Sequence, residues 1–119
     1  TGTFAANPEN INDDNTTNEA EASGVGQYAE VDFGKVVVIK RWRQFGSVGN
    51  NGSGVWKIQY WNLATEAWVD WITGISTRTL ATWSTLSEVT SKLTTKIRLV
   101  CTTVEGGGWT KVKELEVIY

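Results

Sequence analysis

Hydrophobic and polar positions alternate with a period close to two along most of this chain. In the segment YAEVDF, residues 28–33, Ala29, Val31 and Phe33 occupy every second position. Successive side chains point to opposite faces of a β-strand, so this period predicts strands rather than helices. We expect strands wherever the pattern recurs, which is at residues 28–33, 36–45, 55–62, 67–72, 92–102 and 111–119.

Residues typical of turns separate these predicted strands. Gly, Asn, Ser and Asp favour turns because they adopt positive φ or hydrogen-bond to their own backbone. The expected turns and loops are GKV at 34–36, GSVGNNGSG at 46–54, NLATEA at 62–67, TGIST at 73–77 and EGGG at 105–108. Short strands at this spacing predict an all-β fold, an antiparallel β-sandwich. Within it, the apolar run VVVI at 36–39 predicts a strand that is covered on both faces.

Size and composition indicate a single domain, residues 1–119, with one core. The chain has 119 residues, of which 40% are hydrophobic, and this is a common size for one domain. We find no apolar run long enough to span a membrane and no basic and apolar leader. Because Met is absent, we expect the domain to be excised from a larger modular protein. The single cysteine, Cys101, lies in an alternating apolar segment, so we expect a small core residue and no internal disulfide.

Charge and residue types exclude several classes of function. The formal net charge is −2 and the isoelectric point is near 5.1, whereas domains that bind nucleic acid usually carry a basic face. The chain has no histidine, which removes Ser-His-Asp and Cys-His nucleophiles and the commonest zinc ligand. The segment EGGGW at 105–109 lacks the Lys and Ser or Thr of a phosphate-binding loop. We therefore expect a binding protein and not an enzyme.

The N-terminal segment NINDDNTTNEAEA, residues 10–22, is rich in side chains that carry oxygen atoms. It holds four carboxylates and no Lys or Arg, although residues 35–119 carry eleven bases and six acids. Calcium takes about six to eight oxygen ligands from carboxylates, amides and backbone carbonyls. The segment is therefore either a solvated acidic loop or a site for a hard cation, and its composition leaves both interpretations open.

Four stretches, in order along nearly the whole chain, resemble the discoidin domain, also called the coagulation factor 5/8 type C domain. INDDNTTN at 11–18 resembles the family loop A-L-D-G-N-x-S-T, and YAEVDFGKVVVI at 28–39 resembles W-I-x-V-D-L-G-K followed by an apolar strand. WKIQYWNLATEAWVDW at 56–71 is similar to the hairpin Y-x-I-x-Y-S-x-D-G-x-x-W-x-x-V. TKIRLV at 95–100 with WTKVKELEVIY at 109–119 is similar to A-R-Y-V-R-I followed by W-x-x-x-x-E-I-E-V-Y. The family includes the family 32 carbohydrate-binding modules, and the resemblance implies their galactose-binding-domain-like jelly-roll sandwich.

The resemblance also implies a structural calcium ion between the acidic loop and the last strand. In the family the side chain at the position of Asp13 is a ligand, and the last strand supplies a carboxylate at the position of Glu114. Backbone carbonyls and small polar side chains would complete the site. The residues expected to hold the calcium are Asn10, Asp13, Asn15, Asn18, Lys113 and Glu114.

A glycan partner is implied as well, bound by loops at one end of the sandwich. Sugar rings stack an apolar face on aromatic side chains and hydrogen-bond to amides and charged groups. We expect ligand contacts from Gln44, Asn50, Arg78, Trp83 and Trp109. Structural interpretations stay open for several of them, because Trp109 suits the edge of the core and Asn50 suits a plain turn. Galactose-binding members commonly use a His in these loops, so the lack of His disfavours a galactose site of that type.

We therefore expect a non-catalytic carbohydrate-binding module that is extracellular, on a cell surface or associated with a virion. One alternative is a receptor-binding, adhesion or decoration domain of a virion or cell-surface appendage, and another is a structural spacer domain. Exposed, clustered Trp residues would favour binding, and uniformly buried ones would favour a spacer. We expect no nucleic acid as partner, because the isoelectric point is acidic. We do not expect a membrane lipid either, because the apolar loop residues Val25, Phe45 and Val48 are sparse.

Overall fold

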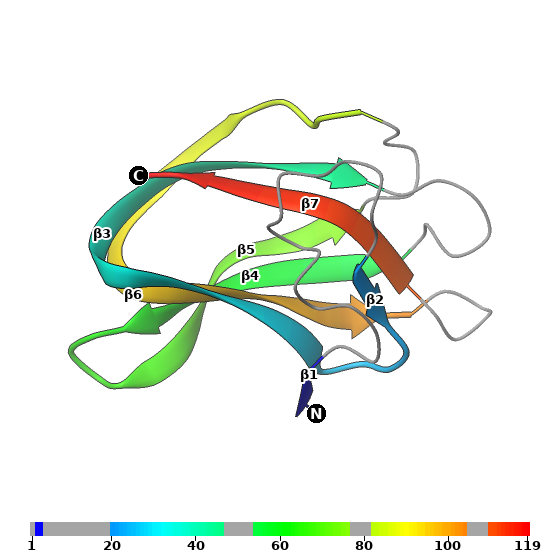
Figure 1. Cartoon of the computed structure of the whole chain (residues 1–119), viewed down its shortest axis with the longest axis horizontal. Coiled ribbons are helices and arrows are strands. Elements are labelled where there is room, and N and C mark those ends of the chain that lie inside the picture. Colours follow the sequence, from blue (N-terminus) through cyan, green and yellow to red (C-terminus); the bar gives the residue numbers. More distant parts are fainter. Residues whose placement is uncertain (1, 4–19, 47–53, 77–81, 105–109) are drawn as a thin grey trace.

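The computed structural model of the chain describes residues 2–3, 20–46, 54–76, 82–104 and 110–119. The strands are β1 (Gly2–Thr3), β2 (Ala20–Ala22), β3 (Gln27–Gly46), β4 (Val55–Asn62), β5 (Ala67–Ser76), β6 (Ser87–Thr103) and β7 (Thr110–Ile118). The predicted all-β fold is confirmed (Figure 1). No helix in the described part of the chain is long and apolar enough to cross a membrane.

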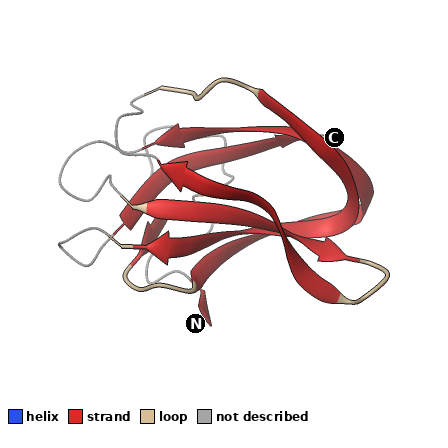
Figure 2. Ribbon diagram, turned by 180° about the vertical axis from the view of Figure 1, so that it is seen from behind, coloured by secondary structure: helices blue, strands red, loops and turns tan. Residues whose placement is uncertain are grey.

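The sandwich has two layers that share their longest strands. In hydrogen-bonded order the sheet runs β2-β7-β3-β6-β4-β5, and β1 pairs with the start of β3. The first layer contains β5, β4, residues 96–103 of β6 and residues 27–32 of β3. The second layer contains β2, β7 and the remaining parts of the two long strands. In this layer β3 pairs with β6 from Val37 onward, and from Arg41 it also pairs with β7. Figure 2 shows β3 and β6 curving together from one layer into the other.

The segment GKV at 34–36, predicted to be a turn between two strands, lies inside β3 instead. Gly34 has a φ of 70°, and its backbone N–H donates a hydrogen bond to Asp32 Oδ1 at 2.8 Å. The register of β3 against β6 shifts between Asp32 and Val37, as it does at a β-bulge. The prediction of two separate strands here is wrong, because the glycine bends the strand without ending its pairing.

The matching bend of β6 is fastened to the first layer by Thr94. This residue is fully buried, and its hydroxyl group contacts the carbonyl oxygens of Trp61 and Lys96, both at 2.8 Å. A buried carbonyl without a hydrogen-bond donor is costly. The Thr94 hydroxyl therefore stabilises the place where β6 leaves one layer for the other.

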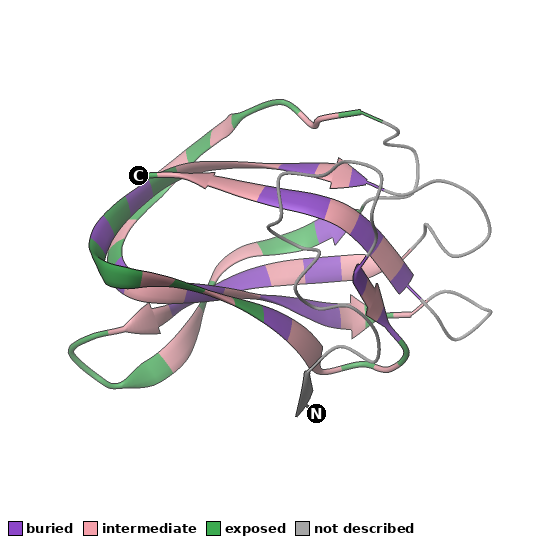
Figure 3. Ribbon diagram, in the orientation of Figure 1, coloured by how far each residue is buried: buried purple, intermediate pink, exposed green. Residues whose placement is uncertain are grey.

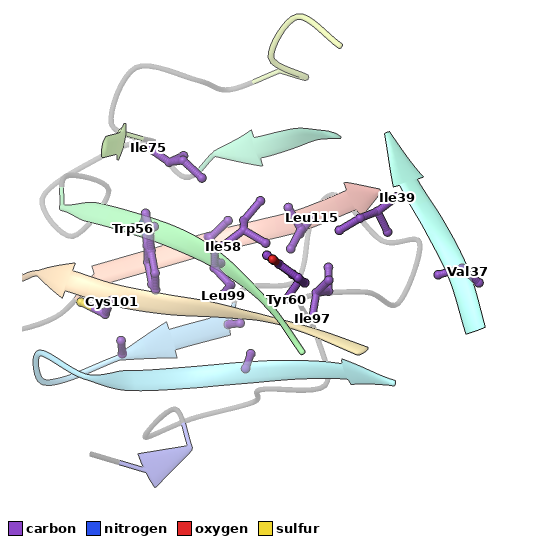
Figure 4. Close-up of a cluster of buried hydrophobic side chains, with 14 residues drawn as sticks. Val37, Ile39, Trp56, Ile58, Tyr60, Ile75, Ile97, Leu99, Cys101 and Leu115 are labelled. Carbon is purple, nitrogen blue, oxygen red and sulfur yellow. The ribbon is translucent and has the colours of Figure 1, made fainter. Parts of the chain in front are cut away.

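The core lies between the layers, on the faces that the alternation predicted. Trp56, Ile58 and Tyr60 of β4 are exposed by only 0%, 0% and 7%, and Figure 3 shows the resulting alternation of buried and partly exposed positions along the strands. Figure 4 shows these side chains beside those of β6 and β7. The core also includes Ile39, Ile97, Leu99, Val112 and Leu115. Cys101 is fully buried as well, which confirms the prediction of a small core residue.

The apolar run VVVI at 36–39 alternates between core and solvent. Val37 and Ile39 are buried, whereas Val36 and Val38 are exposed by 55% and 43%. The prediction that this strand is covered on both faces is wrong, because the second layer packs on the first through one face only. The exposed valines lie on the outer face of the sandwich.

The turn predicted at NLATEA connects β4 to β5. Asn62 Oδ1 accepts hydrogen bonds from the backbone N–H groups of Ala64 and Thr65 at 2.9 and 3.1 Å. Glu66 takes a positive φ of 51° and donates its N–H to the Asn62 carbonyl at 2.8 Å. The following segment, TGIST, was predicted to be a loop, but residues 73–76 continue β5 because they pair with the start of β4.

Candidate functional site

Five strand ends meet at one end of the sandwich, opposite the turn between β4 and β5 (Figure 1). Three strands end there and two begin there, at Gly46, Ser76, Thr103, Val55 and Thr110. The predicted loop at 46–54, which holds Asn50, connects the end of β3 to the start of β4, and the one at 105–108, just before Trp109, lies between the end of β6 and the start of β7. The segment that holds Arg78 and Trp83 leaves from the end of β5. The topology therefore brings the attachment points of two loops and the start of this third segment together at one place, which we call the loop end.

Gly54 joins the two layers at the loop end. Its φ is +146°, and a Cβ atom on it would lie 2.4 Å from both Thr110 Cγ2 and Thr110 Oγ1. The same Cβ would lie 2.9 Å from the Thr103 carbonyl oxygen. Only glycine fits this approach, because such distances are far below ordinary van der Waals contact. The start of β4 is thereby held directly against the start of β7.

Gln44, predicted to contact the ligand, is buried with an exposure of 4%. Its side-chain Nε2 donates to the Ser76 carbonyl oxygen at 3.2 Å. Its backbone N–H donates to Ser84 Oγ at 2.9 Å, and the Ser84 N–H donates back to the Gln44 carbonyl at 2.8 Å. Gln44 thus holds the end of β5 and the segment around Ser84 against β3. This placement favours a bracing role over direct contact with a ligand.

Trp83, also predicted to contact the ligand, is partly exposed at the loop end. It forms an isolated bridge with Phe45, and the two rings meet edge to face with centroids 5.6 Å apart. The Arg43 guanidinium carbon lies 4.3 Å from the Trp83 ring centroid, within cation–π range, and the same guanidinium pairs with Glu116. The indole orientation is therefore fixed by two neighbours.

Arg43 and Phe45 were not predicted to lie beside Trp83. Both lie on one face of β3 because they are two residues apart, and this could be read from the alternation. Their contact with Trp83 joins segments that lie about forty residues apart, a relation that no local pattern reports.

The loop before β3 is closed by its own side chains. Ser23 N–H donates to Gln27 Oε1 at 2.8 Å, and Gln27 Nε2 donates to Ser23 Oγ at 3.2 Å. The Gly26 N–H donates to the Cys101 carbonyl at 2.8 Å, which ties the loop to the end of β6. The Gln27 amide is used within the loop, and Val25 at its tip is 62% exposed.

No protein-family model and no curated protein matches the chain. Similar solved structures include a CBM32 of AlyQ in complex with 4,5-unsaturated mannuronic acid, with a TM-score of 0.78 and 20% identity over 98% of this chain and 92% of that one. A pectin-binding carbohydrate-binding module has a TM-score of 0.71 and 17% identity, with 94% and 79% covered. The family 32 module of Clostridium perfringens NanJ, in complex with galactose, has a TM-score of 0.73 and 17% identity, with 92% and 82% covered. The chain has the discoidin-like fold of family 32 carbohydrate-binding modules.

The discoidin-like fold confirms the predicted jelly-roll sandwich, and the likeness covers one whole module. A larger AlyQ structure that joins a CBM32 to alginate lyase domains matches with a TM-score of 0.79, and this chain covers 31% of it. The similarity is therefore to the module and not to the lyase domains as well.

In this discoidin-like domain, Glu114 and Lys113 are the two predicted metal-binding residues that the structure describes. Glu114 is 2% exposed and lies opposite Phe45 in the ladder between β7 and β3. Strand β2 is the last part of the acidic segment, and its first residue, Ala20, pairs with Val112 of β7. The acidic segment therefore reaches the sheet two residues from a buried carboxylate.

The chemistry of this position suits calcium. A buried carboxylate must be offset by hydrogen-bond donors or by a cation, and carboxylate oxygen is a ligand that calcium prefers. The Lys113 ammonium lies 5.9 Å from the Phe45 ring centroid, so that side chain is engaged elsewhere and its backbone carbonyl is the predicted ligand. The Glu114 carboxylate is thus a ligand of the type that calcium takes, and the ion itself stays a prediction.

The other predicted site residues lie outside the described residues. They are Asn10, Asp13, Asn15 and Asn18 of the metal site and Asn50, Arg78 and Trp109 of the ligand site. Within the described ranges, no three His, Cys, Asp or Glu side chains gather into a metal-binding group. The complete metal site and most ligand contacts stay predictions.

Proposed function

We propose that this discoidin-like domain is a non-catalytic carbohydrate-binding module that contacts a glycan at its loop end. The fold supports the proposal, because structures of this fold hold an unsaturated mannuronic acid and galactose. The observation that carries it is Trp83, a partly exposed indole at the loop end whose orientation is fixed by Arg43 and Phe45. A ring held in this way is suited to stack on the apolar face of a sugar.

Each predicted contact then has a role in this proposal. Trp83 stacks on a sugar ring, while Asn50, Arg78 and Trp109 supply hydrogen bonds and a second aromatic surface from the neighbouring loops. Gln44 holds the frame on which those loops are mounted. A module of this kind acts outside the cell, on a secreted or surface-attached protein of cell or virion, where its polymeric ligand is found.

Binding of a glycan panel to the folded domain tests the loop end. The panel contains alginate, pectin, chitosan and galactose, and affinity is measured by isothermal titration calorimetry. Trp83→Ala should lower the affinity for the glycan about tenfold or more, because aromatic anchors dominate such interfaces. Tyr119→Ala is the matched control, since Tyr119 is an exposed aromatic at the opposite end of β7. Equal affinity of the Trp83 variant and the wild type would refute this site, and the lack of any ligand would favour a spacer or protein-docking domain.

We also propose that calcium links the acidic segment to β7. Glu114 would supply a carboxylate and Lys113 a carbonyl, with Asp13, Asn10 and Asn15 on the facing segment and Asn18 at its end. The ion would act on stability and not on the ligand, because it ties the N-terminal segment to the last strand.

Thermal unfolding in calcium and in chelator tests the metal site. At a calcium concentration of 100 times Kd the stabilisation should be about 2.7 kcal/mol. In Glu114→Gln, calcium should no longer raise the melting temperature. In the control Glu88→Gln the increase should be the same as in the wild type, because the Glu88 side chain is 83% exposed. Equilibrium dialysis of the wild type with calcium gives the stoichiometry independently, and a value of zero would refute the site.

A further inference from the structure

A group of aromatic and cationic side chains covers the outer face of the first layer, away from the loop end. Trp61 of β4 and Trp68 of β5 are direct partners in the hairpin ladder, with ring centroids 5.3 Å apart and ring planes at 72°. Lys96 and Arg98 of β6 and Tyr28 of β3 lie beside them. We call these five residues the outer-face cluster.

Arg98 is the centre of the outer-face cluster. Its guanidinium carbon lies 4.4 Å from the Trp68 ring centroid and 4.8 Å from that of Tyr28. The Lys96 ammonium lies 4.7 Å from the Trp61 ring centroid and 5.3 Å from that of Trp68. Both cations are therefore within cation–π range of two rings each.

A hydrogen-bonded network on the same face of the sheet fixes the direction of Arg98. Its Nε donates to Gln59 Oε1 at 2.7 Å, and Gln59 Nε2 donates to Asp70 Oδ1 at 2.7 Å. Asp70 also pairs with Lys57 at 3.0 Å. Gln59 is only 9% exposed, so it is a rigid support for the guanidinium.

The charged groups on this face differ in how they are partnered. Lys57 pairs with Asp70, and Lys96 pairs with Glu30 at 3.6 Å. Asp32 accepts the Gly34 N–H at the bend. Glu30 lies opposite Arg98 in the ladder between β3 and β6 and acts on its charge at longer range. Among the described residues, Arg98 nevertheless has no ion pair within 4 Å and no hydrogen bond from its terminal nitrogens Nη1 and Nη2.

Stacking on the rings alone does not explain this arrangement. A cation–π stack needs only the positive charge, which Lys96 already supplies to Trp61 and Trp68. Arg98 adds two parallel N–H donors that match the two oxygens of a carboxylate. Nε is fixed by Gln59, so the fork has little rotational freedom left to lose when it binds.

We propose that the outer-face cluster is a second sugar-binding surface that takes a uronate residue of an acidic polysaccharide. The terminal nitrogens of Arg98 bind the carboxylate, and the partly exposed Trp61 and Trp68 contact the sugar ring. Along β4 the surface lies about 13–20 Å from the loop end, since Gln59, the partner of Arg98, and Trp61 are four and six positions beyond Val55. Only a polymeric ligand reaches both places. The proposal rests on the proposed function, because it takes the ligand to be a glycan.

Titration with polygalacturonate or alginate, compared with the same polymer after chemical reduction of its carboxyl groups, tests this surface. Arg98→Gln should weaken binding of the acidic polymer about tenfold, because a charge-assisted bidentate contact is lost, and should leave binding of the reduced polymer unchanged. Arg98→Lys should give an intermediate affinity, since it keeps the charge but not the fork. Arg41→Gln is the matched control, because Arg41 lies on the other layer and is also partly exposed.

A second measurement does not depend on the stability of the variants. In the NMR spectrum of the wild type, the indole N–H signals of Trp61 and Trp68 should shift on addition of a uronate oligosaccharide that is too short to reach the loop end. Unshifted signals, or equal affinities of Arg98→Gln and wild type for the acidic polymer, would overturn the outer-face surface. Those outcomes leave a Trp83-dependent loop end in place. A Trp83→Ala variant that binds the glycan as tightly as the wild type refutes only the loop-end site.

Discussion

Replacement of Gly54 by alanine tests whether the two layers are locked together at the loop end. The new Cβ atom would lie 2.4 Å from two atoms of Thr110 and 2.9 Å from the Thr103 carbonyl oxygen. Thr110 is fully buried, so its side chain has no solvent to move into. The φ of +146° at Gly54 is also one that residues with a side chain rarely adopt.

The expected cost has two parts of similar size. A non-glycine residue at such a φ costs about 1–3 kcal/mol, and overpacking a tight interior contact costs about 1–3 kcal/mol more. Gly54→Ala should therefore lower the free energy of unfolding by about 2–6 kcal/mol, a large share of the total for one domain. Gly74→Ala is the matched control, because Gly74 has a φ of +69° and no atom within 4 Å of an added Cβ. There only the backbone term remains, about 1–2 kcal/mol.

Urea unfolding, followed by Trp fluorescence and circular dichroism, measures both variants. The double variant Gly54→Ala with Thr110→Ala should lose less stability than the two single changes together, since the shortened side chain relieves the clash. A coupling of about 1 kcal/mol or more is expected for residues in direct contact. If Gly54→Ala is no more destabilising than Gly74→Ala, or if the coupling is absent, the close approach of Gly54 to Thr110 does not limit which residue can stand at position 54.

Three further predictions concern single side chains. The Gln59 hydrogen bond and the Lys57 charge hold the pKa of Asp70 below its usual value, so its charged form stabilises the fold above about pH 4 and this contribution is lost as the pH falls further. Asp70→Asn should therefore be less stable than the wild type at neutral pH, and the two free energies of unfolding should converge in acid. A difference between them that stays the same at every pH would contradict this. Burial raises the pKa of the Cys101 thiol, so a thiol reagent should react at the rate of unfolding, and rapid labelling in native buffer would disprove it. Thr94→Val should cost about 1–3 kcal/mol in urea unfolding, because the part-buried carbonyl that accepts its single hydroxyl proton loses that donor, while the exposed Thr90→Val should be near neutral.

The fold could be predicted from the sequence because a strand is a local pattern. Trp56, Ile58 and Tyr60 alternate with polar residues, and all three face the core as expected. The bend at Gly34 could not be predicted in the same way. A glycine two residues after an aspartate suits a turn and a bulge equally well, and only the pairing of β3 with β6 on both sides decides between them.

The candidate site could be predicted in part, for the same reason. Trp83 was recognisable as an aromatic residue in a loop, but the orientation of its ring depends on Arg43 and Phe45, which are distant in sequence. Gln44 was expected at the ligand because amides suit sugars, yet its amide is used on the Ser76 carbonyl. The pairing of Trp61 with Trp68 depends on the register of a hairpin, which the alternation alone does not give.

The continuity of β3 and β6 through both layers limits how the chain can evolve. A residue inserted or deleted at either bend would shift the pairing of everything beyond it, and a shift of one position turns each core side chain outward. Substitutions carry no such penalty, so sequence can diverge freely while the spacing between the two halves of each long strand is fixed. Homologues of this chain should accordingly differ in length at the loop end and at the turn between β4 and β5, and keep the same number of residues between Asp32 and Val37.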